Sequence, residues 1–84
     1  MLKSDVIEVS GTSSAGSGWP DFPYYIKFEG SFPSGKTVKL STVRSVSGTG
    51  VTVGNMVMNR TGYSISVYSA LSQTINLKID YLYT

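Results

Sequence analysis

The chain has 84 residues, of which 40% are hydrophobic and 14% charged, and this length allows one domain with one core. Cysteine and histidine are both absent, which excludes disulfides, thiolate chemistry and nearly all zinc sites. The net charge of +2 is spread over scattered basic residues, so no basic run is expected to follow the phosphates of a nucleic acid. A chain this short buries a modest part of its surface, and we expect oligomerisation to supply further burial.

No apolar run approaches the roughly 20 residues that a membrane-spanning helix needs, and the first residues lack the apolar centre of a signal peptide. The sequence therefore predicts no membrane insertion. It is consistent with a chain made in a cytoplasm that leaves by another route, and equally with a fragment of something longer.

The first 18 residues are predicted to form an arm and a linker. Residues 5–10 have the composition of a strand but alternate poorly, which indicates an arm or an edge strand. Residues 11–18 consist of Gly, Ser, Thr and Ala, which is typical of a flexible spacer, with a functional loop as the alternative. We place a boundary in this run, with the main domain covering residues 19–84.

The main domain is predicted to contain strands only. Residues 19–23 form an aromatic segment in which two prolines exclude a central strand position. Strands are predicted at residues 24–28, 37–46, 51–58, 63–70 and 74–84, separated by segments rich in Gly, Pro, Ser and Asn. No window carries a helical period over a helix-sized length. With residues 5–10 as a sixth strand, this spacing predicts a small six-stranded antiparallel β-sandwich.

Alternation within the strands predicts which side chains face the core. In the strand at 63–70, the apolar residues face one way, and Tyr68 falls on the opposite face. The predicted inward set is Tyr24, Ile26, Phe28, Val38, Leu40, Thr42, Tyr63, Ile65, Val67, Ile75, Leu77, Ile79, Tyr81 and Tyr83. A slip of one residue would reverse every face, so the turn at residues 59–62 sets the register. Gly54, in the middle of a strand, predicts a bulge or a close backbone approach.

Catalysis is not expected from these residues. The acid–base candidates are Asp5, Glu8, Asp21, Glu29 and Asp80, which fall in loops, an arm and an exposed strand face. A glycosidase needs two carboxyl groups at about 5–9 Å in a cleft, which a sandwich of this size rarely forms. No nucleophile-elbow motif is present, and nothing indicates a metal or a cofactor. The sequence therefore predicts a protein that is not an enzyme.

Carbohydrate is the ligand class that the composition favours. Lys27, Lys39 and Lys78 could line a basic surface, but acidic and hydroxyl residues interrupt them, so nucleic acid is not expected. Sugars offer hydroxyls to amides and backbone groups, and they offer C–H faces to aromatic rings. The aromatic candidates are Trp19, Tyr24, Tyr25, Tyr68, Tyr81 and Tyr83.

These aromatic residues are predicted to differ in role. Tyr81 and Tyr83 alternate in phase with apolar positions, so we expect them in the core or at a subunit interface. Tyr68 should face outward, which makes it the better candidate for ligand contact. Trp19 lies in a Pro-flanked loop, where a lid, a platform and a simple plug are equally consistent alternatives.

Residues 25–83 resemble the H-type lectin family in short motifs along most of their length. The matching motifs are Ile26-Lys27-Phe28, Val38-Lys39-Leu40-Ser41, the strand at 51–58, Thr61-Gly62-Tyr63 and Ile79-Asp80-Tyr81-Leu82. The resemblance implies a six-stranded antiparallel sandwich that assembles as a homotrimer. It also implies binding of a sugar of the galactose or N-acetylgalactosamine type.

The start of the main domain resembles the junction found at the C-terminal tips of bacteriophage tail fibres. Gly16-Ser17-Gly18-Trp19 carries this likeness, followed by Tyr24-Tyr25-Ile26-Lys27-Phe28. The resemblance implies a receptor-binding tip on a virion, located outside the cell at the host surface. Its partner would be a bacterial surface carbohydrate from lipopolysaccharide, capsule or wall. The alternative is a purely structural trimerisation or capping module without a ligand.

The sequence departs from the lectin family where that family places its sugar-binding residues. Tyr68-Ser69 is followed here by Ala70-Leu71, whose side chains neither stack broadly nor form hydrogen bonds. If sugar is bound, the contacts must come from other residues. The predicted ligand-binding set is Asn55, Arg60, Tyr68, Ser72, Gln73 and Trp19.

Overall fold

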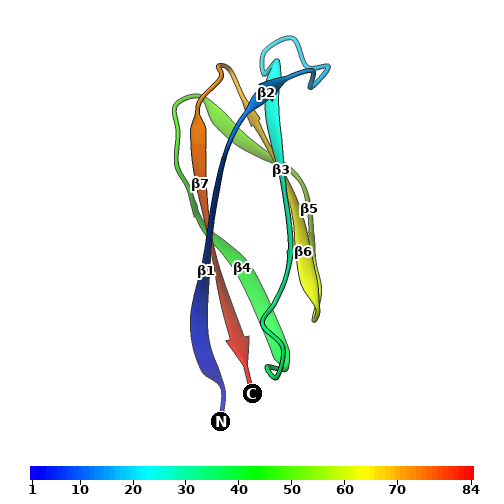
Figure 1. The fold of residues 1–84 in the computed structure, drawn as a ribbon, viewed down its shortest axis with the longest axis vertical. Coiled ribbons are helices and arrows are strands. Elements are labelled where there is room, and N and C mark those ends of the chain that lie inside the picture. Colours follow the sequence, from blue (N-terminus) through cyan, green and yellow to red (C-terminus); the bar gives the residue numbers. More distant parts are fainter.

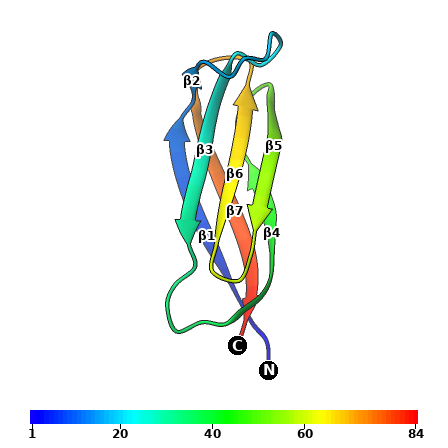
Figure 2. The same ribbon diagram turned by 90° about the vertical axis from the view of Figure 1, so that its right-hand side faces the viewer.

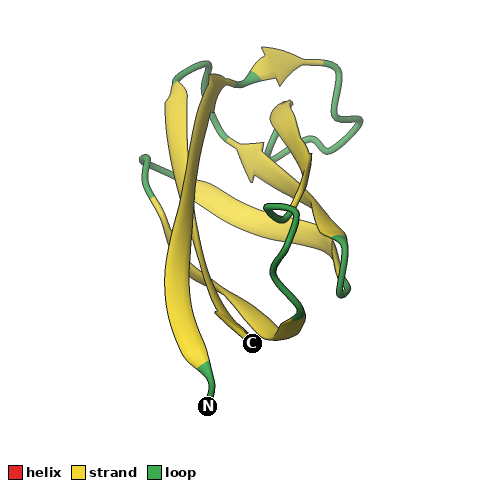
Figure 3. Ribbon diagram, turned by 60° about the horizontal axis from the view of Figure 1, so that its bottom comes forward, coloured by secondary structure: helices red, strands yellow, loops and turns green.

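Seven β-strands and no helix make up the protein in the computed structural model, which describes residues 1–84 (Figure 3). The strands are β1 (Lys3–Thr12), β2 (Ser14–Ala15), β3 (Tyr24–Ser31), β4 (Val38–Val46), β5 (Val51–Met58), β6 (Gly62–Ser69) and β7 (Thr74–Tyr83). One sheet has the order β1-β7-β4 and the other β2-β3-β6-β5, with all neighbours antiparallel. No element is a helix of the length and hydropathy that a membrane span requires.

The two sheets lie face to face as the layers of an elongated sandwich measuring 45 × 18 × 15 Å (Figure 1, Figure 2). This arrangement confirms the predicted all-β antiparallel fold, and the two-residue strand β2 is an addition to the six strands expected. Both chain termini lie at one end, which we call the terminal end (Figure 1). The loop between β2 and β3 lies at the opposite end, which we call the loop end.

The core lies between the sheets and is centred on β6 and β7. In both strands, buried side chains alternate with more exposed ones, which confirms the predicted faces, including the outward position of Tyr68. The buried apolar residues are Phe28, Phe32, Val38, Tyr63, Ile65, Val67, Ile75, Leu77, Ile79 and Tyr81. Phe32 was expected in a loop and does follow β3, but its side chain enters the core.

Strand β4 departs from its predicted faces. Val38 is buried as expected, whereas Leu40 is 62% exposed and Thr42 is also exposed, so the prediction that these two face inward is wrong. The cause is a register shift against β7 between Val38 and Leu40, because one extra residue sends the following side chains to the other face. Val43 and Val46 pack against the core instead.

The N-terminal residues are part of the sandwich. Of the two alternatives for residues 5–10, the structure has the edge strand: β1 pairs with β7 along Lys3–Thr12. The run predicted as a flexible spacer carries the chain from one sheet to the other, with β2 paired to β3. Packing explains Gly11 in this run, since a Cβ there would lie 2.3 Å from Ile26 Cδ1.

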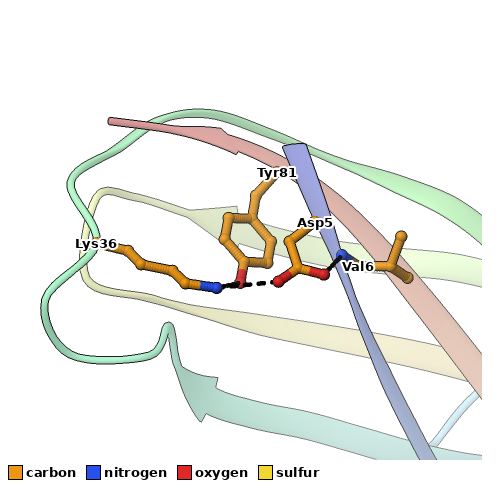
Figure 4. A network of polar contacts seen from close by, with 4 residues as sticks. All are labelled: Asp5, Val6, Lys36 and Tyr81. Carbon is orange, nitrogen blue, oxygen red and sulfur yellow. Dashed lines mark hydrogen bonds and ion pairs between the residues drawn. The ribbon is translucent and has the colours of Figure 1, made fainter. Parts of the chain in front are cut away.

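An ionic contact joins β1 to the loop before β4 at the terminal end (Figure 4). Lys36 Nζ lies 2.9 Å from Asp5 Oδ2 and 3.2 Å from the Tyr81 hydroxyl, and 4.5 Å from the centre of the Tyr83 ring. The Val6 N–H also donates to Asp5 Oδ1 at 2.8 Å. Hydrogen bonds from Lys36 and then from Val6 lower the pKa of Asp5, and the hydrogen bond to Asp5 raises the pKa of Lys36.

Candidate binding site on the four-stranded sheet

The loop between β2 and β3 folds back on itself and holds Trp19 at the loop end. Gly16 and Ser17 donate their N–H groups to the Pro23 carbonyl at 3.1 and 3.3 Å, which closes the base of the loop. The Ser17 hydroxyl bonds the Phe22 carbonyl and also accepts the Trp19 N–H at 3.0 Å. These bonds fix the backbone on both sides of an indole that is 60% exposed.

Trp19 stands against a pair of tyrosines on the outer face of the sheet. Tyr25 and Tyr68 are direct cross-strand partners on β3 and β6, with ring centres 6.4 Å apart and planes inclined by 31°. The Trp19 ring lies 6.4 Å from Tyr68 at 72°, an edge-on contact. The two tyrosines therefore form a tilted floor, and the indole forms a wall beside it.

A hollow of about 230 Å³ opens next to this wall. Its lining comes from the loop, from β6 and from β5, which pairs with β6 (Figure 2). We define the aromatic site as this hollow with the adjoining tyrosine: Trp19, Phe22, Tyr25, Thr52, Gly54 and Tyr68. The site offers an apolar lining in which the planes of the Trp19 and Tyr68 rings are inclined by 72°.

The outer face continues from the aromatic site as a polar surface. Lys27 and Glu29 follow Tyr25 along β3 and form an exposed ion pair at 3.0 Å. Ser66 and Ser64, opposite them on β6, are half-buried. Because the charges of this pair offset each other, the surface next to the aromatic site presents hydroxyls and a neutral ion pair.

The structure brings together two of the predicted contact residues, Trp19 and Tyr68. The indole is too exposed for the plug alternative and forms the wall of the site. Asn55 is exposed and follows Gly54 on β5, close to the site in sequence. Arg60 lies in the turn between β5 and β6 at the terminal end, beside a separate hollow against β4. Arg60 is therefore far from the aromatic site.

Ser72 and Gln73, also in the predicted set, lie in a network that joins the two sheets at the loop end. Gln73 Nε2 donates to Ser69 Oγ at 2.7 Å and to the Thr49 carbonyl at 2.8 Å, and its Oε1 accepts the Thr49 N–H at 3.0 Å. The Ser72 hydroxyl donates to the Ser13 carbonyl at 3.1 Å. These polar groups are engaged within the chain, so both side chains act in the fold.

Sequence reasoning did not place Phe22, Tyr25, Thr52 and Gly54 in the predicted set. Tyr25 and Thr52 are the cross-strand partners of Tyr68, so pairing the predicted strands in register could have found them. Gly54 was predicted to mark a bulge or a close backbone approach, and the register shift between Val53 and Met56 shows the bulge. Phe22 lies in a loop, so neither strand alternation nor strand pairing could have placed it at the site.

A larger hollow of about 560 Å³ lies on the outer face of the three-stranded sheet. Val6, Leu82 and Leu40 lie across it on β1, β7 and β4, and Arg44 pairs with Asp80 at 3.6 Å on its margin. Asp5, the other charged residue of its lining, pairs with Lys36, so the charges at this hollow are already paired within the chain. The aromatic site is the better candidate for specific recognition.

Acidic side chains do not converge anywhere in the structure. No group of three or more that could hold a metal ion is present. Each of the four ion pairs joins one basic to one acidic side chain. No protein-family model, curated protein or solved structure matches this chain.

Proposed function

We propose that the protein is a non-catalytic carbohydrate-binding domain that works as a trimer. Its place would be the receptor-binding tip of a phage tail fibre or a similar spike, where it contacts a bacterial surface glycan outside the cell. The observation that carries this proposal is the aromatic site, with an exposed indole held edge-on to a tyrosine pair.

The geometry of the aromatic site suits a sugar ring. A pyranose has an apolar C–H face, which can lie on the Tyr25 and Tyr68 rings while its edge meets Trp19. The exposed side chain of Thr52 on β5 lines this position and can bond a ring hydroxyl. Contacts of this kind give weak binding at one site, and three sites on one axis would raise the effective affinity.

The β5 edge supports the proposal of a trimer. Met56 is opposite the fully buried Ile65 on β6, yet it is 51% exposed, and Val57 beside it is exposed as well. No charged residue occurs from residue 45 to residue 59, whereas the edge strands β1 and β4 each carry charges. Edge strands are normally protected by charge, so an uncharged apolar edge favours contact with another copy.

The alternative is a structural trimerisation or capping module without a ligand. It is favoured by Ala70-Leu71 and by the internal hydrogen bonds of Ser72 and Gln73. Under this alternative, the β5 edge would have the same role, and the aromatic site would be only a surface feature. Glycan binding at Trp19 and Tyr68 is therefore the property that distinguishes a carbohydrate-binding domain from a structural module.

The test is binding of the isolated domain to a panel of bacterial lipopolysaccharides, capsular polysaccharides and wall polysaccharides. We expect binding to at least one preparation, lost in Trp19→Ala and in Tyr68→Ala. Arg60→Ala is the matched control, because Arg60 is exposed at the other end of the sandwich, and it should bind as wild type. A folded trimer that binds no preparation would support the structural module, and light scattering that shows a monomer would refute the trimer.

A further inference from the structure

Gly54 lies against the Cδ2–Cε2 edge of the Tyr68 ring. A Cβ built on Gly54 would be 2.1 Å from Tyr68 Cε2, 2.7 Å from Cδ2 and 3.3 Å from Cζ. These distances are far shorter than a van der Waals contact between carbon atoms. The Cδ2–Cε2 edge of the Tyr68 ring therefore lies in the space that a side chain at position 54 would occupy.

Backbone conformation does not explain the glycine at this position. The glycines with a positive φ are Gly16, Gly18, Gly35, Gly48 and Gly50. Gly54 is not among them, so an alanine could adopt its φ without strain. What position 54 requires is the absence of a side chain, and the atoms that require it belong to Tyr68.

The bulge in β5 explains how the ring reaches this position. Thr52 is the direct partner of Tyr68, and the register against β6 shifts after Val53. Gly54 is two residues beyond Thr52 on β5. This makes Gly54 a diagonal neighbour of Tyr68, at a distance that an aromatic ring can reach. The extra residue at the bulge increases the local twist of β5.

The position of the Tyr68 ring sets the shape of the aromatic site. Tyr68 is the ring that both Trp19 and Tyr25 contact, each at a centre-to-centre distance of 6.4 Å. A Cβ at position 54 would push this edge of the ring away from β5. The displaced ring would enter the hollow that Trp19, Thr52 and Gly54 line, or it would push against the indole.

We propose that Gly54 is the positioning residue of the aromatic site, because its missing side chain leaves room for the edge of the Tyr68 ring and so sets the position of that ring. The effect on ligand rests on the proposed carbohydrate-binding function, whereas the effect on the rings does not. Gly54 contacts no ligand in this proposal and acts only through Tyr68.

The first test measures the rings without any ligand. Trp19 is the only tryptophan, so emission excited at wavelengths that tyrosine does not absorb reports on the site alone. Gly54→Ala should change the Trp19 emission and lower the thermal midpoint. In a Tyr68→Ala background, the same substitution should change neither, because the clash has been removed. Asn55→Ala, at the next position of the bulge, is the matched control and should leave the emission as in wild type.

The second test measures binding to a polysaccharide preparation that the wild-type domain binds. Gly54→Ala should weaken binding on the order of tenfold, while Asn55→Ala should weaken it less. If Gly54→Ala does not fold and the double variant with Tyr68→Ala does, the clash is demonstrated directly.

Two results would overturn the proposal. One is a Gly54→Ala protein with unchanged Trp19 emission, and the other is a thermal effect that persists in full when Tyr68 is alanine. A wild-type domain that binds no preparation would refute the proposed function instead. In that case, the fluorescence and the double-mutant cycle still decide whether Gly54 positions Tyr68.

Discussion

Each end of the sandwich has a cluster of aromatic side chains, and the two clusters differ in what surrounds them. At the terminal end, Phe32, Tyr63 and Tyr81 are buried between the sheets, with Phe32 5.1 Å from Tyr81 and 5.9 Å from Tyr63 between ring centres. At the loop end, the aromatic site lies on the outer face of one sheet. The rings of the first cluster pack in the core, and those of the second lie at the surface.

The difference shows that aromatic content alone does not indicate a binding surface. The terminal cluster lies on inward positions of β6 and β7 and is covered by the loop that contains Phe32. The loop-end cluster depends on the outward phase of Tyr68 and on a backbone path that brings Trp19 beside it. Substitutions in the first cluster should therefore change stability, and those in the second should change binding.

The largest expected effect is that of Phe32→Ala. Its ring is buried against two tyrosines, so truncation should lower the free energy of unfolding by about 3–5 kcal/mol. The matched substitution at the loop end, Trp19→Ala, should cost less than about 1 kcal/mol because the indole is largely exposed. Urea unfolding of both variants measures this difference, and equal losses would contradict the assignment of the two clusters.

The next effect concerns the hydrogen-bond network beneath the loop end. Gln73→Ala removes the amide that joins Ser69, which is fully buried, to the Thr49 backbone. We expect a loss of about 2 kcal/mol in the free energy of unfolding, with binding at the aromatic site retained. If Gln73 instead contacted the ligand, as the sequence predicted, binding would fall while stability stayed near wild type. Unfolding and binding measured on the same variant separate these outcomes.

Much of the fold could be predicted because β6 and β7 alternate without interruption. Ile75, Leu77 and Ile79 are buried as their spacing indicated. The faces of β4 could not be predicted, since its first bulge falls at a position without glycine and leaves no mark in the composition. Phe32 could not be recognised as a core residue, because it follows β3 in a segment of Gly, Ser and Pro, where alternation gives no information.

The candidate site could be predicted only in part for a related reason. The outward phase of Tyr68 is a local property of one strand. The Ser72 hydroxyl is engaged by Ser13, 59 positions earlier, and the Gln73 amide by Thr49, 24 positions earlier. Contacts between segments this far apart depend on the path of the whole chain, and short motifs do not contain that path.

The smallest expected effect is a dependence of stability on pH, which we expect at the terminal end and not at the loop end. At the terminal end, the pKa of Asp5 is lowered from its ordinary 3.8 by the hydrogen bond from Lys36 and then by that from Val6. The ionised carboxylate therefore stabilises the fold above about pH 4, and this contribution is lost as the pH falls through the lowered pKa of the folded state. The pKa of Lys36 is raised from 10.5, so its contribution is complete below that pH and is lost only as the pH rises well beyond it.

Lys36→Met keeps an apolar stem near the Tyr83 ring and removes the charge. Its thermal midpoint should lie slightly below that of wild type at pH 7, because the pair is partly exposed. The gap should narrow as the pH is lowered below about 4, because Asp5 becomes protonated and the partner of Lys36 is lost in wild type as well. The Gln73 network contains only amide, hydroxyl and backbone groups, so the gap between wild type and Gln73→Ala should stay constant over the same range. A gap for Lys36→Met that is equally independent of pH would show that the ion pair does not stabilise the terminal end, and that its buried aromatic cluster holds the loop before β4 without it.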